Sequence, residues 1–165
     1  LINLTDDFGV IQFSKHSTPD KSSGYTLDDN ARALIFSILH SKLFKNEQTE
    51  KISQNLVKTY LDFIEYSQES NGNFKNNHKN EEEELNSHSE DSFGRAIWAL
   101  GYTINNTEDV KIKEKAKFIL DKSLNFIDKI ESPRTKAFAI IGLCHYYKTY
   151  PNSKILSIIR NYEQT

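Results

Sequence analysis

The sequence predicts an all-α domain of paired antiparallel helices behind a short extended leader. Apolar residues recur at helical spacing in six stretches, and mostly short connections separate them, which makes consecutive helices antiparallel neighbours. In addition, the first, third and fifth stretches begin with related residues, as in a repeated helical hairpin. The predicted helices cover residues 28–43, 52–64, 93–104, 112–130, 137–144 and 155–159.

Two stretches fall outside the helical pattern. Residues 1–27 hold an extended run, Val10 to Phe13, followed by turn-forming residues, and we predict a leader or an edge strand there. Residues 70–88 are rich in Asn, Glu and His and include the acidic run Glu81 to Glu84. We predict a mobile loop that buries no apolar face, with its four glutamates in solvent.

Composition limits the class of protein. A chain of 165 residues fits one domain, 1–165, and 23 acidic against 21 basic residues leave no strong field for nucleic acid or an anionic membrane. No apolar stretch approaches the ~18 residues of a membrane-spanning helix, and the first residues lack the pattern of a signal peptide. We therefore expect a cytoplasmic protein that does not insert into membranes. The absence of methionine suggests a fragment of a longer chain.

The single cysteine, Cys144, cannot form an internal disulfide and lies in an apolar run. We predict an inert, buried thiol, which favours a reducing compartment. The histidines show no metal-like spacing, so we expect neither a metal nor a cofactor.

The starts of the first, third and fifth helices share a pattern. Residues 28–33, 91–96 and 132–137 each begin with a residue that can cap a helix and continue to a cation four positions later and then alanine. This spacing predicts ion pairs from Asp28 to Arg32 and from Asp91 to Arg95. The first helix of each hairpin is rich in small residues, which predicts a closely packed inner layer, with the second helices outside. Such hairpins stack into a solenoid or a closed toroid.

If the inner helices are parallel, their N-termini gather polar residues on one rim. Carboxylates and arginines there can bind vicinal hydroxyls, and Tyr25, Phe93 and Trp98 could stack on sugar rings. We assign Asp29 and Asp91 as a candidate acid/base pair, with Glu90 as the alternate, because the doubled acids exceed what a cap needs. The predicted rim comprises Asp28, Asp29, Asn30, Arg32, Glu90, Asp91, Arg95 and Arg134.

A second interpretation gives the same residues structural roles. An aspartate at a helix start is a common cap, and an exposed i,i+4 ion pair adds only ~0.2–0.5 kcal/mol. The chain would then be a helical-repeat interaction module that positions a partner.

Residues 4–12 and 24–34 resemble a bacterial and archaeal family of six-hairpin, glycosidase-like α/α-toroid domains, often found beside or fused behind a group-1-type glycosyltransferase. Residues 90–101 and 132–134 look like the second and third signatures of that family. The resemblance implies that this chain supplies about half of a toroid. It also implies that the rim residues, with Gln12, Tyr25 and Trp98 near them, line a sugar-binding cavity. The implied partners are a glycan, the rest of the toroid or a fused glycosyltransferase domain, and a second copy in a weak homodimer. We expect the fragment alone to be inactive.

Overall fold

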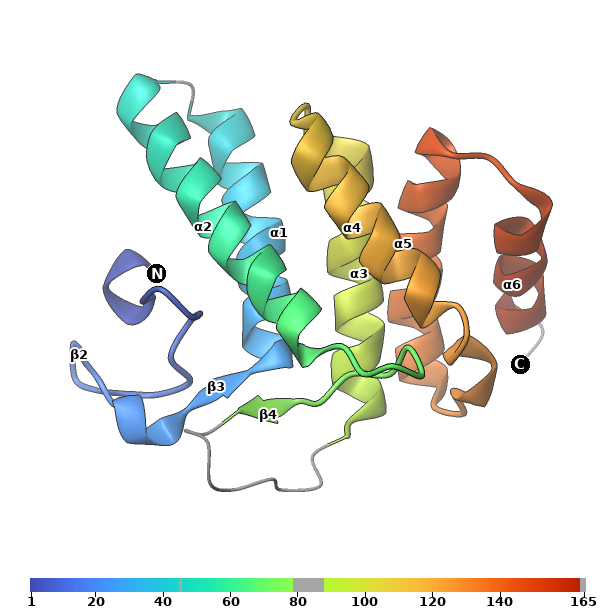
Figure 1. Ribbon diagram of the computed structural model, residues 1–165, viewed down its shortest axis with the longest axis horizontal. Helices are drawn as coiled ribbons and strands as arrows, with labels where there is room; N and C mark the ends of the chain where they lie inside the picture. Colours follow the sequence, from blue (N-terminus) through green and yellow to red (C-terminus); the bar gives the residue numbers. More distant parts are fainter. Residues whose placement is uncertain (45, 79–87, 164–165) are drawn as a thin grey trace.

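The computed structural model describes residues 1–44, 46–78 and 88–163, and within these ranges the chain forms six α-helices joined as three antiparallel hairpins (Figure 1). This confirms the all-α prediction. The helices are α1 (Leu27–Leu43), α2 (Glu47–Ser67), α3 (Glu90–Asn106), α4 (Val110–Ser123), α5 (Pro133–Thr149) and α6 (Ser153–Glu163).

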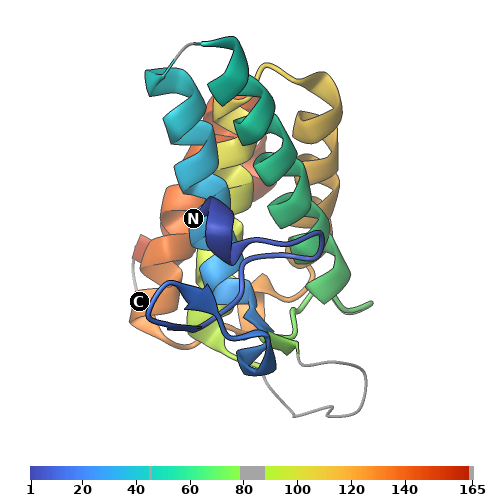
Figure 2. The same ribbon diagram turned by 90° about the vertical axis from the view of Figure 1, so that its left-hand side faces the viewer.

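The first helices of the hairpins form one layer. In Figure 1, α1, α3 and α5 run parallel with their N-termini at the same end, and α3 packs against both of its neighbours. Helices α2 and α4 cover one face of this layer, as the side view in Figure 2 shows, whereas α6 lies beside α5. The N-termini of α1, α3 and α5 therefore share one rim. The half-toroid stays a prediction.

Helices α3 and α5 touch through their backbones. A Cβ atom placed on Gly101 would lie 2.0 Å from the carbonyl oxygen of Gly142, and one placed on Gly142 would lie 2.2 Å from that of Ile97. Only glycine fits at such a crossing. The expected close packing of small residues is thus confirmed for this pair of helices.

The core lies between the two layers and contains fully buried aromatic rings. Phe93 packs against Phe74 and Phe126, with ring centroids 5.7 and 5.5 Å away. Since Phe93 is only 1% exposed, it cannot stack on a sugar ring, and this sequence-based expectation is wrong. Its position faces the core because α4 and the segment before β4 cover that side of α3.

The leader is irregular, with short extended pieces rather than one long strand. It contains two 3₁₀ turns, η1 (Ile2–Leu4) and η2 (Lys21–Ser23), and an antiparallel pair of two-residue strands, β1 (Ser14–Lys15) and β2 (Thr18–Pro19). Val10 and Ile11 form only isolated bridges. The leader joins the helical body where β3 (Tyr25–Thr26) pairs with β4 (Asn77–His78).

The described part of the predicted loop, residues 70–78, packs on the body. Phe74 is 1% exposed, so the prediction that this stretch buries no apolar group is wrong. Gly72 has φ of +91°, and a Cβ atom there would lie 2.3 Å from the carbonyl oxygen of Lys122. This turn brings Phe74 into the core. The glutamates Glu81 to Glu84 lie outside the described residues.

Two further predictions need correction. The fourth helix ends at Ser123, and Ile127 lies in the 3₁₀ turn η3 (Ile127–Lys129), where its carbonyl oxygen accepts a hydrogen bond from the Tyr162 hydroxyl of α6. Cys144 is exposed rather than buried. Leu143 and Tyr146 lie on the buried face of α5, whereas Cys144 lies on an exposed face of the helix.

Replacing Gly101 with alanine tests the α3–α5 contact. Although alanine favours helix by about 1 kcal/mol, the added methyl group overlaps backbone atoms of α5 and forces the helices apart. We expect the free energy of unfolding to fall by roughly 1–3 kcal/mol in denaturant titration. Cys144→Ala, on the exposed face of α5, is the matched control and should change little. Equal stability of G101A and the natural chain would contradict a backbone contact here.

Candidate functional site

Two of the three helices that build the rim, α1 and α3, are capped two residues earlier than the sequence pattern suggests, whereas α5 is capped at Ser132, as the pattern predicts. The hydroxyls of Thr26, Ser89 and Ser132 accept hydrogen bonds from the backbone N–H groups three residues on. Asp28 and Asp91 are therefore not the caps, but occupy the second helical position, where the helix dipole still favours a carboxylate. Aligned on the caps, Arg134 takes the place of these aspartates in α5.

Alternating charges run along the rim from α1 through α3 to α5. We call this set the charge row. Each cation in it contacts at least one acid, and two of the contacts join different helices. The charge row consists of Asp29, Arg32, Asp28, Arg95, Asp91 and Arg134.

At the α1 end, Arg32 holds both acids of its own helix. Its Nη2 donates to Asp29 Oδ1 at 2.6 Å and to Asp28 Oδ2 at 2.9 Å. The other oxygen of Asp29 accepts a 2.7 Å hydrogen bond from the Thr26 hydroxyl. The predicted Asp28–Arg32 pair is confirmed, and Asp29 also supports the helix cap.

Arg95 connects α1 with α3. Its Nε lies 2.7 Å from Asp28 Oδ1 and 2.9 Å from Asp91 Oδ2, and its N–H bond is directed at Asp91. Asp28 Oδ1 is consequently buried without a hydrogen bond from any described residue. Arg134 Nε approaches the other oxygen of Asp91 at 3.0 Å and extends the row to α5. The predicted Asp91–Arg95 pair is confirmed as part of this larger network.

Burial has a clear effect on Asp28. It raises the pKa of this carboxyl above the ordinary value, an effect that Arg32 and Arg95 oppose and that Asp29 and Asp91 reinforce. Between the ordinary and the raised pKa, the folded chain binds more protons than the unfolded chain. The contribution of Asp28 to stability therefore falls as pH rises through that interval.

The acids of the row are not arranged as an open catalytic pair. Asp28 and Asp91 both contact one nitrogen of Arg95, so these oxygens are closer than the ~6.5–9.5 Å of an inverting glycosidase pair, but the guanidinium lies between them. Asp29 and Asp91 are separated along the row by Arg32, Asp28 and Arg95. No free carboxylate pair faces a common space along this row.

Aromatic rings adjoin the row on α3 and α5. Trp98 stacks on Phe138 with centroids 5.7 Å apart and planes 8° from parallel, and both rings are half-buried. The Arg95 guanidinium carbon lies 4.6 Å from the centre of the Phe138 ring, and that of Arg134 lies 6.0 Å away. The row and the Trp98–Phe138 pair therefore form one continuous surface. The sequence analysis did not assign Phe138 to the site. When the three helices are aligned on their caps, Phe138 occupies the position in α5 that Arg32 and Arg95 occupy in α1 and α3.

Two predicted rim residues have structural contacts instead. Asn30 is completely buried, where its amide donates to Thr26 O and accepts from Val10 N, tying the leader to α1. The Glu90 carboxylate accepts hydrogen bonds from the backbone N–H of Ser132 at 2.8 Å and of Glu131 at 3.3 Å. Glu90 thus fixes the start of α5 against α3.

Gln12 and Tyr25 lie toward the leader. Gln12 lines a shallow hollow of about 450 Å³ together with Asp29 and Arg32, so the α1 end of the row opens there. The Tyr25 hydroxyl donates to Asp6 Oδ2 at 2.7 Å, and its ring packs on Phe8. Burial, and then this hydrogen bond and the charge of Asp6, raise the pKa of Tyr25 to about 12. Tyr25 is anchored in the leader and is not part of the row.

Comparisons with known proteins add no assignment. No protein-family model matches the chain, and no curated protein matches it. The family resemblance stays a prediction that rests on the sequence signatures. Across residues 1–44, 46–78 and 88–163, no three His, Cys, Asp or Glu side chains are grouped to hold a metal ion. Nor is any helix in those ranges long and apolar enough to span a membrane.

Removing Arg95 should destabilise the fold more than removing Arg134. Arg95 is 14% exposed and joins two helices, so Arg95→Gln leaves two half-buried carboxylates close together, at a cost of roughly 1–3 kcal/mol. Arg134 is 69% exposed, and Arg134→Gln should cost less than about 1 kcal/mol. Denaturant titrations compare the two. The reverse order of stabilities would show that the row does not hold α1 to α3.

The Tyr25–Asp6 contact predicts a loss of stability at alkaline pH. Because the folded pKa of about 12 exceeds the ordinary value of 10.0, the stability contributed by neutral Tyr25 is complete below pH 10 and disappears as pH rises through 12. The difference in phenolate absorbance between the natural chain and Tyr25→Phe should titrate near pH 12. A difference titrating near pH 10 would contradict the contact.

Proposed function

We propose that this chain is a carbohydrate-binding domain that holds a microbial glycan at the rim of its inner helices. The observation that supports this most directly is the continuous surface formed by the charge row and the Trp98–Phe138 pair. Charged donors and acceptors beside aromatic faces suit a ligand that is polyhydroxylated at its edge and apolar on its ring face.

The two most exposed members of the row are cations, although the third cation, Arg95, is only 14% exposed. Arg134 and Arg32 are 69% and 52% exposed, whereas the three aspartates are 28–35% exposed. An arriving glycan would therefore meet guanidinium groups first. In Arg134 only Nε has a partner among the described residues, so its terminal N–H groups can donate to sugar hydroxyl or carboxylate oxygens without breaking the row.

We propose binding as the primary activity of the fragment. Glycoside hydrolysis needs one carboxyl group to donate a proton and another to act as base or nucleophile, and the acids of the row are neutralised by arginines. Asp29 and Asp91, with Glu90 as alternate, stay the proposed acid/base residues of a complete toroid.

The half-toroid itself is part of the proposal. A parallel inner layer with outer helices on one face is the arrangement that such a toroid requires, and the signatures at residues 24–34, 90–101 and 132–134 lie at the starts of the inner helices. The remaining hairpins, or a fused glycosyltransferase domain, are the proposed partners, and a weak homodimer is the alternative cover. We propose a cytoplasmic location on the sequence evidence above.

A second candidate function is a non-catalytic interaction module. Two of the paired acids at the helix starts have structural contacts, which favours this function. Asp29 supports the cap of α1, and Glu90 binds the start of α5. In that case the row serves mainly to align the helices, and no glycan binds to it.

Trp98 is the only tryptophan of the chain, so its fluorescence reports on this surface directly. We expect a glycan selected by array screening to change the emission of Trp98 saturably. Arg134→Gln should weaken this binding at least about tenfold while leaving stability nearly unchanged. Arg160→Gln removes another exposed cation, on α6, and is the matched control. Unaltered binding by R134Q, or no array binding by a folded protein, would favour the interaction module.

A further inference from the structure

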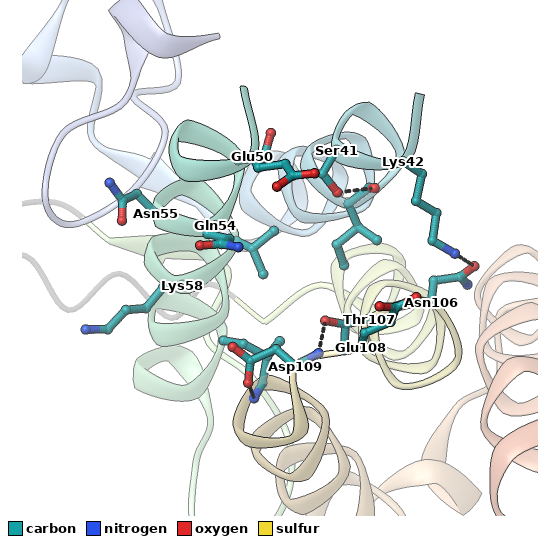
Figure 3. A pocket seen from close by; sticks show the side chains of 14 residues that line it. Ser41, Lys42, Glu50, Gln54, Asn55, Lys58, Asn106, Thr107, Glu108 and Asp109 are labelled. Atoms are coloured by element: carbon teal, nitrogen blue, oxygen red, sulfur yellow. Dashed lines mark hydrogen bonds between the residues drawn. The ribbon is translucent and has the colours of Figure 1, made fainter. Parts of the chain in front are cut away.

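A hollow lies at the end opposite the rim, between the first and second hairpins. It has a volume of about 710 Å³, within the ~300–1,000 Å³ of small-molecule sites. The C-terminal end of α1, the first half of α2 and the link from α3 to α4 enclose it (Figure 3). It shares no residue with the charge row or the Trp98–Phe138 pair.

The floor of this hollow is apolar and its walls are polar. Ile38 of α1 and Val57 of α2 are buried beneath it, and Ile112 of α4 completes the floor. Two carboxylates line opposite walls, Glu50 from α2 and Glu108 from the link between α3 and α4. Both are exposed, and neither side chain makes a hydrogen bond or ion pair with another described residue.

The cations at the hollow are engaged or directed elsewhere. The Lys42 ammonium donates to Asn106 Oδ1 at 2.7 Å, and Figure 3 shows Lys58 extending away from the space between the helices. A third acid, Asp109, caps α4 by accepting from Lys111 N and Ile112 N through Oδ1. The hollow therefore has two exposed carboxylates, on two sides of an apolar floor, that have no partner among the described residues.

We propose that this hollow binds a linear aliphatic diamine or polyamine. The two ammonium ends of such a molecule would pair with Glu50 and Glu108, and its methylene chain would lie on the floor formed by Ile38, Val57 and Ile112. Among the described residues that line the hollow there is no aromatic side chain, which distinguishes it from the proposed glycan surface. This inference is independent of the glycan proposal.

Calorimetric titration at low ionic strength with cadaverine, pentylamine and pentanediol of the same chain length provides the test. We expect cadaverine to bind saturably and pentanediol, which keeps the length but lacks charge, to bind at least about tenfold more weakly. Pentylamine, with one ammonium group, should lie between them. Cadaverine should leave the fluorescence of Trp98 unchanged, since that ring lies outside the hollow.

The double variant Glu50→Gln with Glu108→Gln should lose about tenfold or more in cadaverine affinity. Glu131→Gln, an exposed acid before α5, is the matched control and should bind as the natural chain does. Thermal unfolding of each variant verifies that the fold is retained. Equal binding of cadaverine and pentanediol, no saturable binding of cadaverine, or full affinity in a folded double variant would each overturn the proposal.

Discussion

The backbone contact between α3 and α5 is the constraint on which the rim depends. With Gly101 and Gly142 at the crossing, the helices approach more closely than side chains would allow. That approach places Phe138 of α5 within 4.6 Å of the Arg95 guanidinium carbon and within stacking distance of Trp98. It also lets Arg134 reach Asp91. A wider crossing would separate the aromatic rings from the charges, and the surface proposed for the glycan would divide into two.

On the other side of α3, the charge row joins this helix to α1. Among the described residues, no glycine contact like that between α3 and α5 is found there. Arg95 brings Asp28 of α1 and Asp91 of α3 to one guanidinium, so electrostatics replaces close backbone packing at this junction. The arrangement has a cost, because Asp28 Oδ1 is buried without a hydrogen bond and burial raises the pKa of the group. Because ion pairs align α1 and α3, charged side chains stay at this junction, where a purely apolar contact would leave no group able to bind a polar ligand.

Much of the fold follows from local patterns in the sequence, and the failures have identifiable causes. Helical spacing and small residues predicted the hairpins and the close inner layer, because both depend on local periodicity and side-chain size. The caps of α1 and α3 were displaced by two residues because several capping types lie near each helix start, as Thr26, Asp28 and Asp29 do in α1, and sequence alone does not choose among them. Cys144 and Phe93 were misplaced because a short apolar run does not fix which face of a helix meets its neighbour.

The ion pairs within a helix were predictable from spacing, but the contacts of Arg95 with Asp28 and of Arg134 with Asp91 depend on how separate helices pack. The hollow between the hairpins likewise arises from tertiary packing and has no sequence signature.

The difference in exposure within the row bears on how a ligand could bind without unfolding the rim. The aspartates are less exposed than Arg134 and form ion pairs with Arg32 and Arg95. Arg134 lies at the end of the row, and only its Nε contacts an acid. A ligand that draws on the terminal N–H groups of Arg134 leaves the pairs between α1 and α3 intact. By contrast, a ligand that competes for Asp28 or Asp91 must first displace Arg95, which also binds the face of Phe138. Approach from the α5 end, along Arg134 and the Trp98–Phe138 pair, therefore disturbs the fewest contacts, and it makes Arg134 the residue through which binding and stability can be separated.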